Sequence, residues 1–246
     1  MNISKTLGMS YRVAKENPLI LIPMLAASVF AVVLSLIVVG SAVPMIAGFG
    51  DDPSAITSEE AIAGIGAAVG GGFLVSVISG IVGLLAHGLT VAMADMALRG
   101  ESPTLASGWA RFAPRLLPVI IASVLVGLIV GLGTILLVLP GIVAGFLLIF
   151  TIAAVVVDEL GPGGAISRSA KTVTQNFGAT FVFFLVVLGL GILAGIVSGI
   201  VGTIPFLGAI LTMAVSAAFT GFLTIFTLAT YRMLSNSSED EPEAEA

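Results

Sequence analysis

A single histidine interrupts a long apolar stretch of the chain. His87 lies twelve residues before Arg99, about 18 Å away along a helix. If this stretch crosses a bilayer, the imidazole lies near mid-membrane, where ionisable groups relay protons, contact substrates or bind metals. The structural alternative is a neutral imidazole bonded to a backbone carbonyl or to a serine such as Ser123 or Ser198. Both interpretations stay open.

A second group of ionisable residues lies at the ends of the apolar stretches. Asp95 precedes Arg99 by four positions, the spacing of an ion pair on one helix face. We expect a belt of ion pairs at the membrane surface, with an anionic headgroup or phosphate site between helix ends as the alternative. The predicted members of this belt are Asp95, Arg99, Arg111, Arg115, Asp158, Arg168 and Lys171.

Catalysis is not indicated by these residues. Acid–base catalysis by Asp95 with Asp158 is a third interpretation of the belt, but nothing in the sequence brings these carboxylates together. The chain has no cysteine, no second histidine and no nucleophile beside a base at a usable spacing, which disfavours a metal or covalent site. The sequence therefore predicts a protein that is not an enzyme, without catalytic residues, cofactor or metal.

The composition shows which kind of element must position these side chains. Hydrophobic residues make up 58% of the 246 residues and charged residues only 9%, whereas a soluble domain carries about 25% charged residues. This excludes an ordinary soluble enzyme, a nucleic-acid-binding protein, a disulfide scaffold and a disordered chain. The predicted fold class is all-α, a polytopic helical bundle integral to the membrane.

Four stretches lack Asp, Glu, Lys and Arg, namely 17–50, 61–94, 116–157 and 172–231. About 20 residues cross a bilayer as a helix, so the first two stretches hold one span each. The last two, of 42 and 60 residues, must fold back, with breakers at Leu139-Pro140-Gly141 and at Pro205. Six spans result, predicted at 19–43, 72–98, 115–138, 141–158, 177–201 and 207–233.

The basic residues orient these six spans. All nine Lys and Arg residues fall on the side that holds both termini, and none falls in the opposite connections. Five or seven spans would scatter them over both faces. By the positive-inside rule, we expect both termini in the cytoplasm and the protein in the cell membrane as a multi-pass component.

A short amphipathic stretch precedes each odd-numbered span, at 3–14, 104–116 and 165–177. Apolar residues recur in them at the spacing of helices that lie in the headgroup plane. They are Ile3, Leu7, Tyr11 and Ala14; Leu105, Trp109, Phe112 and Leu116; and Ile166, Ala170, Val173 and Phe177. The predicted architecture is three hairpins, each preceded by a cytoplasmic amphipathic helix. Internal duplication and a shared way of inserting hairpins both account for this repeat.

Short motifs mark the second hairpin and the segment after it. Val138-Leu139-Pro140-Gly141-Ile142 opens the fourth span, Val155-Val156-Val157-Asp158-Glu159 closes it, and Gly161-Pro162, Ala165-Ile166, Arg168-Ser169 and Asn176-Phe177 follow. This layout resembles a broad group of uncharacterised six-span membrane proteins of bacteria and archaea, which includes the membrane domain joined to some glycerophosphodiester phosphodiesterases. In those fused proteins a separate soluble barrel carries out hydrolysis. The resemblance therefore implies the topology and no activity for this chain.

Small residues at four-residue spacing predict where the spans pack. Gly191, Gly195 and Gly199 form one stripe on the fifth span, which is therefore the predicted central helix. On this interpretation, Gly195→Leu loosens the bundle and lowers its thermal stability. An interface between copies of the chain is the alternative.

The predicted organisation is a six-span membrane domain at 1–234 and a disordered acidic tail at 235–246. The leading functional hypothesis is an accessory, scaffold or lipid-associated membrane component. The alternative is a small transporter or lipid flippase with His87 in its path, although transporters commonly use a helix broken at the binding site and the predicted breaks lie at the outer edge. Expected partners are the bilayer and its anionic headgroups; a protein partner or homo-oligomer stays open. Nucleic acid is not expected.

Overall fold

The computed structural model describes residues 3–47, 59–204 and 207–239. These residues form helices and turns, and none of them is in a strand. Six helical segments of the described chain are long and apolar enough to cross a membrane, namely Pro18–Val38, Val69–Leu98, Leu105–Leu136, Val138–Val157, Phe177–Gly202 and Gly208–Asn236. The prediction of an all-α, multi-pass membrane protein is therefore confirmed.

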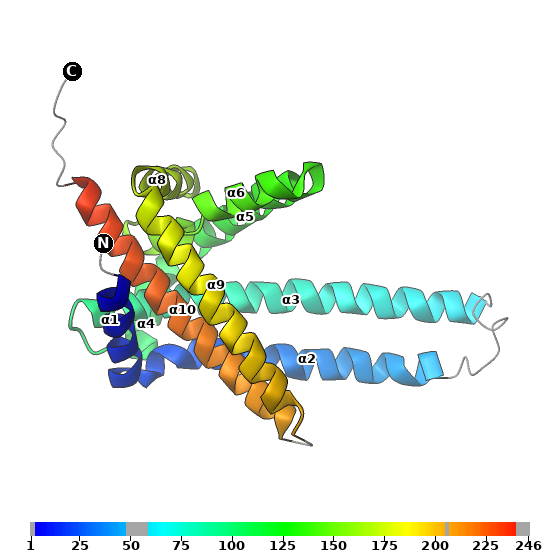
Figure 1. Cartoon of the computed structure of the whole chain (residues 1–246). Helices are drawn as coiled ribbons and strands as arrows, with labels where there is room; N and C mark the ends of the chain where they lie inside the picture. Colours follow the sequence, from blue (N-terminus) through cyan, green and yellow to red (C-terminus); the bar gives the residue numbers. More distant parts are fainter. Residues whose placement is uncertain (1–2, 48–58, 205–206, 240–246) are drawn as a thin grey trace.

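Three helical hairpins contain these spans, except that Leu105–Phe112 at the start of the third span form a separate short helix (Figure 1). The first consists of η1 (Pro18–Leu21), α2 (Ile22–Ala47) and α3 (Glu59–Leu98). The second consists of η3 (Ala113–Arg115), α5 (Leu116–Leu136), α6 (Val138–Leu147) and α7 (Thr151–Val157), and the third of α9 (Phe177–Gly202) and α10 (Gly208–Glu239). A short helix precedes each hairpin, respectively α1 (Ile3–Glu16), α4 (Leu105–Phe112) and α8 (Pro162–Gln175).

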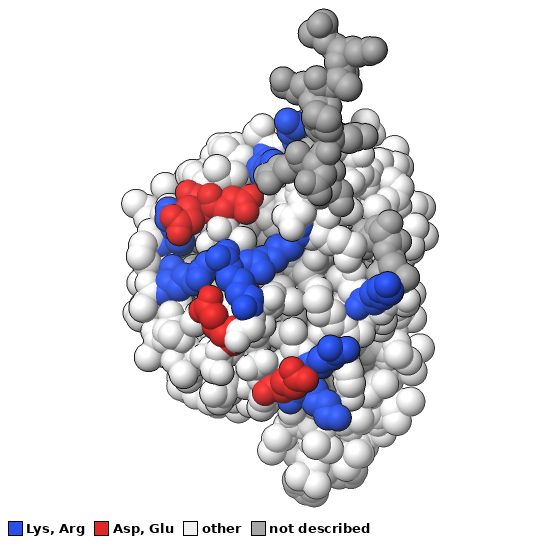
Figure 2. All heavy atoms as spheres, turned by 90° about the vertical axis from the view of Figure 1, so that its left-hand side faces the viewer, with Lys and Arg blue, Asp and Glu red and all other residues white. Residues whose placement is uncertain are grey.

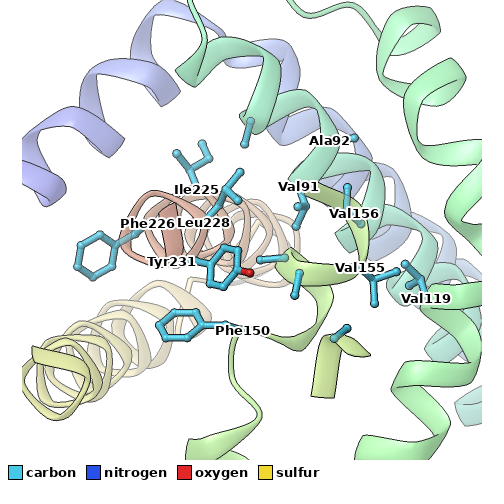
Figure 3. Close-up of a cluster of buried hydrophobic side chains, with 14 of the residues drawn as sticks. Val91, Ala92, Val119, Phe150, Val155, Val156, Ile225, Phe226, Leu228 and Tyr231 are labelled. Atoms are coloured by element: carbon cyan, nitrogen blue, oxygen red, sulfur yellow. The ribbon is translucent and has the colours of Figure 1, made fainter. Parts of the chain in front are cut away.

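The hairpins meet at one end of the molecule and diverge towards the other (Figure 1). The short helices α1, α4 and α8 lie where the hairpins meet, and we call this the charged end because the ion pairs described below lie there. Phe150, Phe226 and Tyr231 belong to the buried core of this region (Figure 3). Beyond it, the hairpins expose many large apolar side chains, as expected for surfaces that face lipid.

The fourth span is two helices instead of the single helix predicted at 141–158. Helix α6 ends at Leu147 and α7 begins at Thr151. Ser169 of α8 covers the break, because its Oγ accepts a hydrogen bond from the Phe150 N–H (3.1 Å) and donates to the Leu147 carbonyl (2.9 Å). Backbone groups freed by a break in an apolar interior need such partners.

The turn between α5 and α6 lies just before the predicted breaker. Leu137 is extended, with φ −159° and ψ 132°, and Pro140 lies in the first turn of α6, where proline is tolerated. Gly141 lies against the backbone of Thr134, since a Cβ on Gly141 would be 2.7 Å from Thr134 N. Pro205, the other predicted breaker, lies outside the described residues.

The short helices bury within the protein only some of the apolar residues predicted to face the membrane. On α4, Phe112 is fully buried, whereas Leu105 and Trp109 are 42% and 47% exposed. Gly108 lies against the side chain of Met93 on α3, which turns Phe112 inward. Tyr11 of α1 is also exposed, and α8 buries the face that contains Ala165, Ser169, Thr172 and Val173.

The glycine stripe of α9 is not a packing surface within the described chain. Gly195 and Gly199 are exposed, and a Cβ on Gly191, Gly195 or Gly199 would meet no atom within 4 Å. The prediction that α9 is the central helix is therefore wrong. Helix α10 occupies that place, packing against α2, α3, α8 and α9.

Helix α10 extends to Glu239, beyond the start of the tail predicted to be disordered from residue 235. Ser235 is buried, and its hydroxyl donates to the Arg232 carbonyl at 3.3 Å. Leu234 and Ser235 therefore still pack against the core at the charged end. Residues 240–246 of the predicted tail lie outside the described residues.

Candidate functional site

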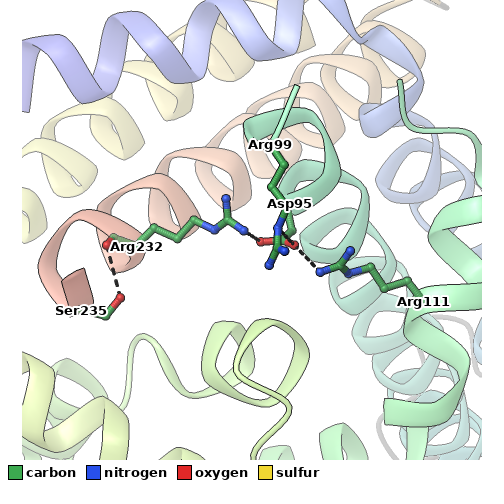
Figure 4. Close-up of polar contacts among 5 residues, drawn as sticks. All are labelled: Asp95, Arg99, Arg111, Arg232 and Ser235. Atoms are coloured by element: carbon green, nitrogen blue, oxygen red, sulfur yellow. Dashed lines mark hydrogen bonds and ion pairs between the residues drawn. The ribbon is translucent and has the colours of Figure 1, made fainter. Parts of the chain in front are cut away.

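A fully buried carboxylate gathers three arginines at the charged end (Figure 4). Asp95 of α3 has no exposed side-chain surface. Its Oδ2 lies 3.1 Å from Arg99 Nε and 2.8 Å from Arg111 Nη2, and its Oδ1 pairs with Arg232 Nη2. The arginines come from α3, α4 and α10, so one carboxylate connects three helices. We call these four residues the Asp95 cluster.

The Asp95 cluster carries more positive than negative charge. Three guanidinium groups face one carboxylate, which leaves two positive charges in excess. A buried carboxylate is stable only when it is paired, because its desolvation costs several kcal/mol. The arginines provide this pairing and keep part of their side chains exposed, from 24% for Arg232 to 45% for Arg99. The excess charge therefore reaches the protein surface.

Close packing of α4 on α3 brings Arg111 to Asp95. The neighbouring Phe112 is fully buried, and its ring lies directly over Gly88. A Cβ on Gly88 would fall 2.5 Å from Phe112 Cζ, so only glycine leaves room for the ring. The position of the Arg111 guanidinium therefore depends on the contact between Phe112 and Gly88. Gly88 lies two helical turns before Asp95 on α3.

Asp158 forms a second, smaller group beside the Asp95 cluster. It follows α7, and its Oδ2 accepts a hydrogen bond from the Tyr231 hydroxyl and lies 3.6 Å from Arg168 Nε. Tyr231 and Arg232 are consecutive residues of α10. The end of this helix therefore holds both carboxylates, Asp95 through Arg232 and Asp158 through Tyr231.

Arg115 and Lys171 of the predicted belt lie apart from both the Asp95 cluster and the Asp158 group. Arg115 pairs with Glu159, whose side chain is 64% exposed and whose backbone is left-handed, with φ 58°. Exposed pairs of this kind contribute about 0–1 kcal/mol. Lys171 is exposed on α8 and forms no ion pair with any residue that the structure describes.

Two hollows open at the charged end, among α3, α7, α8 and α10. The larger has a volume of about 410 Å³ and is lined by Arg99, Val157, Asp158, Arg232, Ser235 and Asn236. The other, of about 380 Å³, is lined by Asp158, Leu160, Arg168, Ser235 and Asn236. Figure 2 shows charged side chains of both signs gathered on this end of the molecule. The larger hollow brings two arginines of the Asp95 cluster to one space.

The sequence patterns predict most residues of this site but not the part played by Arg232, which completes the Asp95 cluster. Asp95, Arg99 and Arg111 come together as one cluster, and Asp158 joins Arg168. The sequence does not predict the roles of Arg232 and Tyr231. A signal for Arg232 is present, because the 60-residue stretch without charge ends immediately before it and places it at the same membrane level as Arg99.

His87 lies in a separate cavity, about two helical turns from Asp95 on α3. Its Nδ1 is 3.2 Å from Thr224 Oγ1, so its side-chain partner is a threonine of α10 and not one of the predicted serines. The cavity has a volume of about 400 Å³ and is lined by α3, α5, α10 and the break between α6 and α7. A helix break therefore lies beside His87, contrary to the expectation that the breaks lie only at the outer edge.

The Asp95 cluster and the His87 cavity offer different chemistry. Among the residues that the structure describes, no three His, Asp or Glu side chains form a group able to hold a metal ion. The Asp95 cluster presents guanidinium donors, which suit an anion. The His87 cavity presents an imidazole and hydroxyl groups within an apolar lining, which suit a group that forms hydrogen bonds.

Ser169→Ala tests the role of the serine that covers the broken span. We expect the free energy of unfolding to fall by about 1–3 kcal/mol, because the Phe150 N–H and the Leu147 carbonyl lose a buried partner. Thermal unfolding in a neutral detergent measures the change. Ser167→Ala, on the exposed face of α8, is the control, and equal melting temperatures for the two variants would argue against this role of Ser169.

Comparison with known proteins adds a family but no activity. No curated protein and no solved structure matches the chain. Residues 1–234, which include the first five spans, all but two residues of the sixth, the Asp95 cluster and His87, match one family. The chain belongs to this family, which is described as a domain of unknown function, DUF7847.

Proposed function

We propose that the protein is a lipid-associated membrane component that binds anionic lipid headgroups through the Asp95 cluster and catalyses no reaction. The observation that carries this proposal is the convergence of three arginines on one buried carboxylate, with Arg99 and Arg232 lining the same hollow. Guanidinium groups bind phosphate oxygens through paired N–H donors. Phospholipids present such oxygens at the level where the spans end.

The number of arginines favours binding over a purely structural role. One guanidinium neutralises one carboxylate, and each further cation at the same carboxylate repels the first. An additional anion in the larger hollow relieves this repulsion, and the hollow also offers the polar side chains of Ser235 and Asn236. Asp158 lines the same hollow, but its charge is engaged by Arg168 and Tyr231.

The proposal places the charged end at the cytoplasmic surface of the cell membrane. All nine basic residues of the chain fall on the side of the termini when six spans are counted, as the positive-inside rule requires. The exposed Leu105 and Trp109 of α4 suit the boundary between headgroups and acyl chains, where tryptophan is enriched. In this setting α1, α4 and α8 lie along the membrane surface around the Asp95 cluster.

Lipid retention by the purified protein tests the proposal. The protein in a neutral detergent is titrated with phosphatidylglycerol or with phosphatidylcholine of the same acyl chains, and bound lipids are counted by native mass spectrometry. We expect tighter binding of phosphatidylglycerol. Arg99→Gln should weaken it about fivefold, because one arginine near an anionic surface contributes about 1 kcal/mol. Arg111 and Arg232 still pair with Asp95 in this variant.

Lys171→Gln is the matched control, because it changes the net charge equally at the same end of the molecule but outside the Asp95 cluster. It should retain phosphatidylglycerol as the wild type does. Equal losses in the two variants would show diffuse attraction without a built site, and equal retention of both lipids by the wild type would refute the proposal. Displacement of phosphatidylglycerol by inorganic phosphate would instead indicate a site for a soluble anion.

A second candidate function, lipid transport between leaflets, is favoured by the break in the fourth span beside His87. Discontinuous helices form the binding sites of many transporters. In vesicles that contain fluorescent phosphatidylglycerol, a transporter accelerates exchange between leaflets, and His87→Leu slows that exchange. Exchange at the rate of protein-free vesicles would eliminate this candidate.

A further inference from the structure

The cavity beside His87 has the size and lining of a small-molecule site. Its volume of about 400 Å³ falls within the range of about 300–1,000 Å³ for ligand sites in proteins. Val91 and Leu228, labelled in Figure 3, belong to both its lining and the buried core. The lining is mainly aliphatic, and its polar side chains are His87, Ser123, Thr151, Thr224 and Thr227. Apart from His87, no described residue of the lining is ionisable.

Hydrogen bonding determines which imidazole nitrogen is open to a ligand. The Thr224 hydroxyl has one proton, which it donates to the Thr220 carbonyl at 2.9 Å. Its oxygen therefore accepts the proton of His87 Nδ1, which lies 3.2 Å away. In the neutral ring, Nε2 is then an acceptor. No residue that the structure describes donates to Nε2, so this position is open to a donor from a ligand.

Ser123 presents a second unused polar group in the same cavity. Its Oγ is buried but forms no hydrogen bond with the described residues. Other hydroxyl side chains in the spans, such as Ser28 and Thr220, donate to the carbonyl four residues earlier. Ser123 does not, although a buried hydroxyl normally has a partner. Its hydroxyl is therefore available to a molecule in the cavity.

We propose that the cavity binds an uncharged amphiphile through a hydroxyl group. The hydroxyl donates to His87 Nε2, its oxygen accepts from Ser123, and the hydrocarbon part contacts the aliphatic lining. A carboxylate or phosphate is disfavoured, because no Lys or Arg of the described residues lines the cavity and an unpaired charge is costly in an apolar interior. The site differs in residues and in ligand chemistry from the Asp95 cluster, and it does not depend on the function proposed for that cluster.

Photolabelling of the full chain in phosphatidylcholine vesicles tests this assignment. The probe is a twelve-carbon alcohol with a diazirine on its chain, and mass spectrometry locates the labelled peptides. We expect labels near His87, near Ser123 and at 148–153, reduced at least fivefold by excess dodecanol. The matching carboxylic acid, ionised at pH 8, should label these peptides at least fivefold less than the alcohol.

A pair of glycine variants on α5 separates the cavity from the lipid-facing surface. Gly127 lines the cavity, and a Cβ there would meet no atom within 4 Å, so the side chain of Gly127→Leu starts in open space beside the cavity. Gly131 is equally open one turn further along but does not line the cavity. Gly127→Leu should lower labelling by the alcohol at least fivefold and Gly131→Leu should leave it within twofold. Equal labelling in both variants would overturn the site.

His87→Leu tests the hydroxyl contact itself. We expect labelling by the alcohol to fall at least fivefold while labelling by a diazirine-bearing dodecane stays within twofold, because the apolar lining is kept. Undiminished labelling by the alcohol would overturn the hydrogen bond to His87. Absence of any specific label in the wild-type cavity would show that it holds water only and would overturn the proposal.

Discussion

Asp95→Asn is expected to lower the free energy of unfolding by about 3 kcal/mol, the lower end of the range for breaking a buried ion pair. The amide keeps the shape of the side chain but removes the charge that three arginines share. The lower end applies because the arginines are partly exposed and water screens part of their repulsion. For a chain of this size, the melting temperature should fall by about 6–12 °C.

Thermal unfolding in a neutral detergent, followed by the fluorescence of the single tryptophan, Trp109, measures this effect. Glu159→Gln is the matched control, because it also removes a carboxylate paired with an arginine but at a side chain that is 64% exposed. Its melting temperature should change by no more than about 2–4 °C. An Asp95→Asn protein as stable as the control would show that the carboxylate does not hold the three helices together.

Gly88→Leu is expected to lower the stability by about as much as Asp95→Asn. Phe112 fills the space beside Gly88 and is fully buried in the core, so a leucine at position 88 must displace its ring. Overpacking costs about 1–3 kcal/mol and occasionally more, and we expect about 3 kcal/mol here. Because α4 must shift, Arg111 should also lose its contact with Asp95, and the environment of Trp109 should change.

Two further variants make this prediction specific. Gly88→Leu combined with Phe112→Ala restores the summed volume, so the double variant should be more stable than Gly88→Leu alone. Gly195→Leu should leave the melting temperature unchanged, because a Cβ at Gly195 meets no atom within 4 Å. A large loss at Gly195, or a Gly88→Leu protein that melts like the wild type, would contradict the packing described here.

The glycine positions illustrate what a pattern of small residues can establish. Gly191, Gly195 and Gly199 lie on one stripe in any α-helix, but this spacing does not say which neighbour faces the stripe. The described chain leaves it uncovered, whereas the isolated Gly88 receives a phenylalanine ring. Close approach depends on the direction in which two helices cross, which the spacing along one helix does not contain.

The polar residues also include contacts that the sequence predicts and contacts that it does not. The pair of Asp95 with Arg99 follows from four-residue spacing on one helix. Arg232 joins them from 137 residues further along the chain than Asp95, as His87 joins Thr224 over the same separation. No local pattern relates residues so far apart, so these partners depend on how the third hairpin packs against the first.

The amino-acid sequence was enough to predict that the protein is helical, that six of its segments are long and apolar enough to cross a membrane, and that its basic residues flank these segments. This was possible because a backbone in lipid must satisfy its own hydrogen bonds and because charged side chains are excluded from the apolar interior. Three features required the packed helices to be seen: the fourth span is broken, Asp95 pairs with three arginines, and His87 borders a cavity. These features depend on packing and hydrogen bonds between side chains of different helices. Such contacts cannot be read from the spacing of residues along one helix.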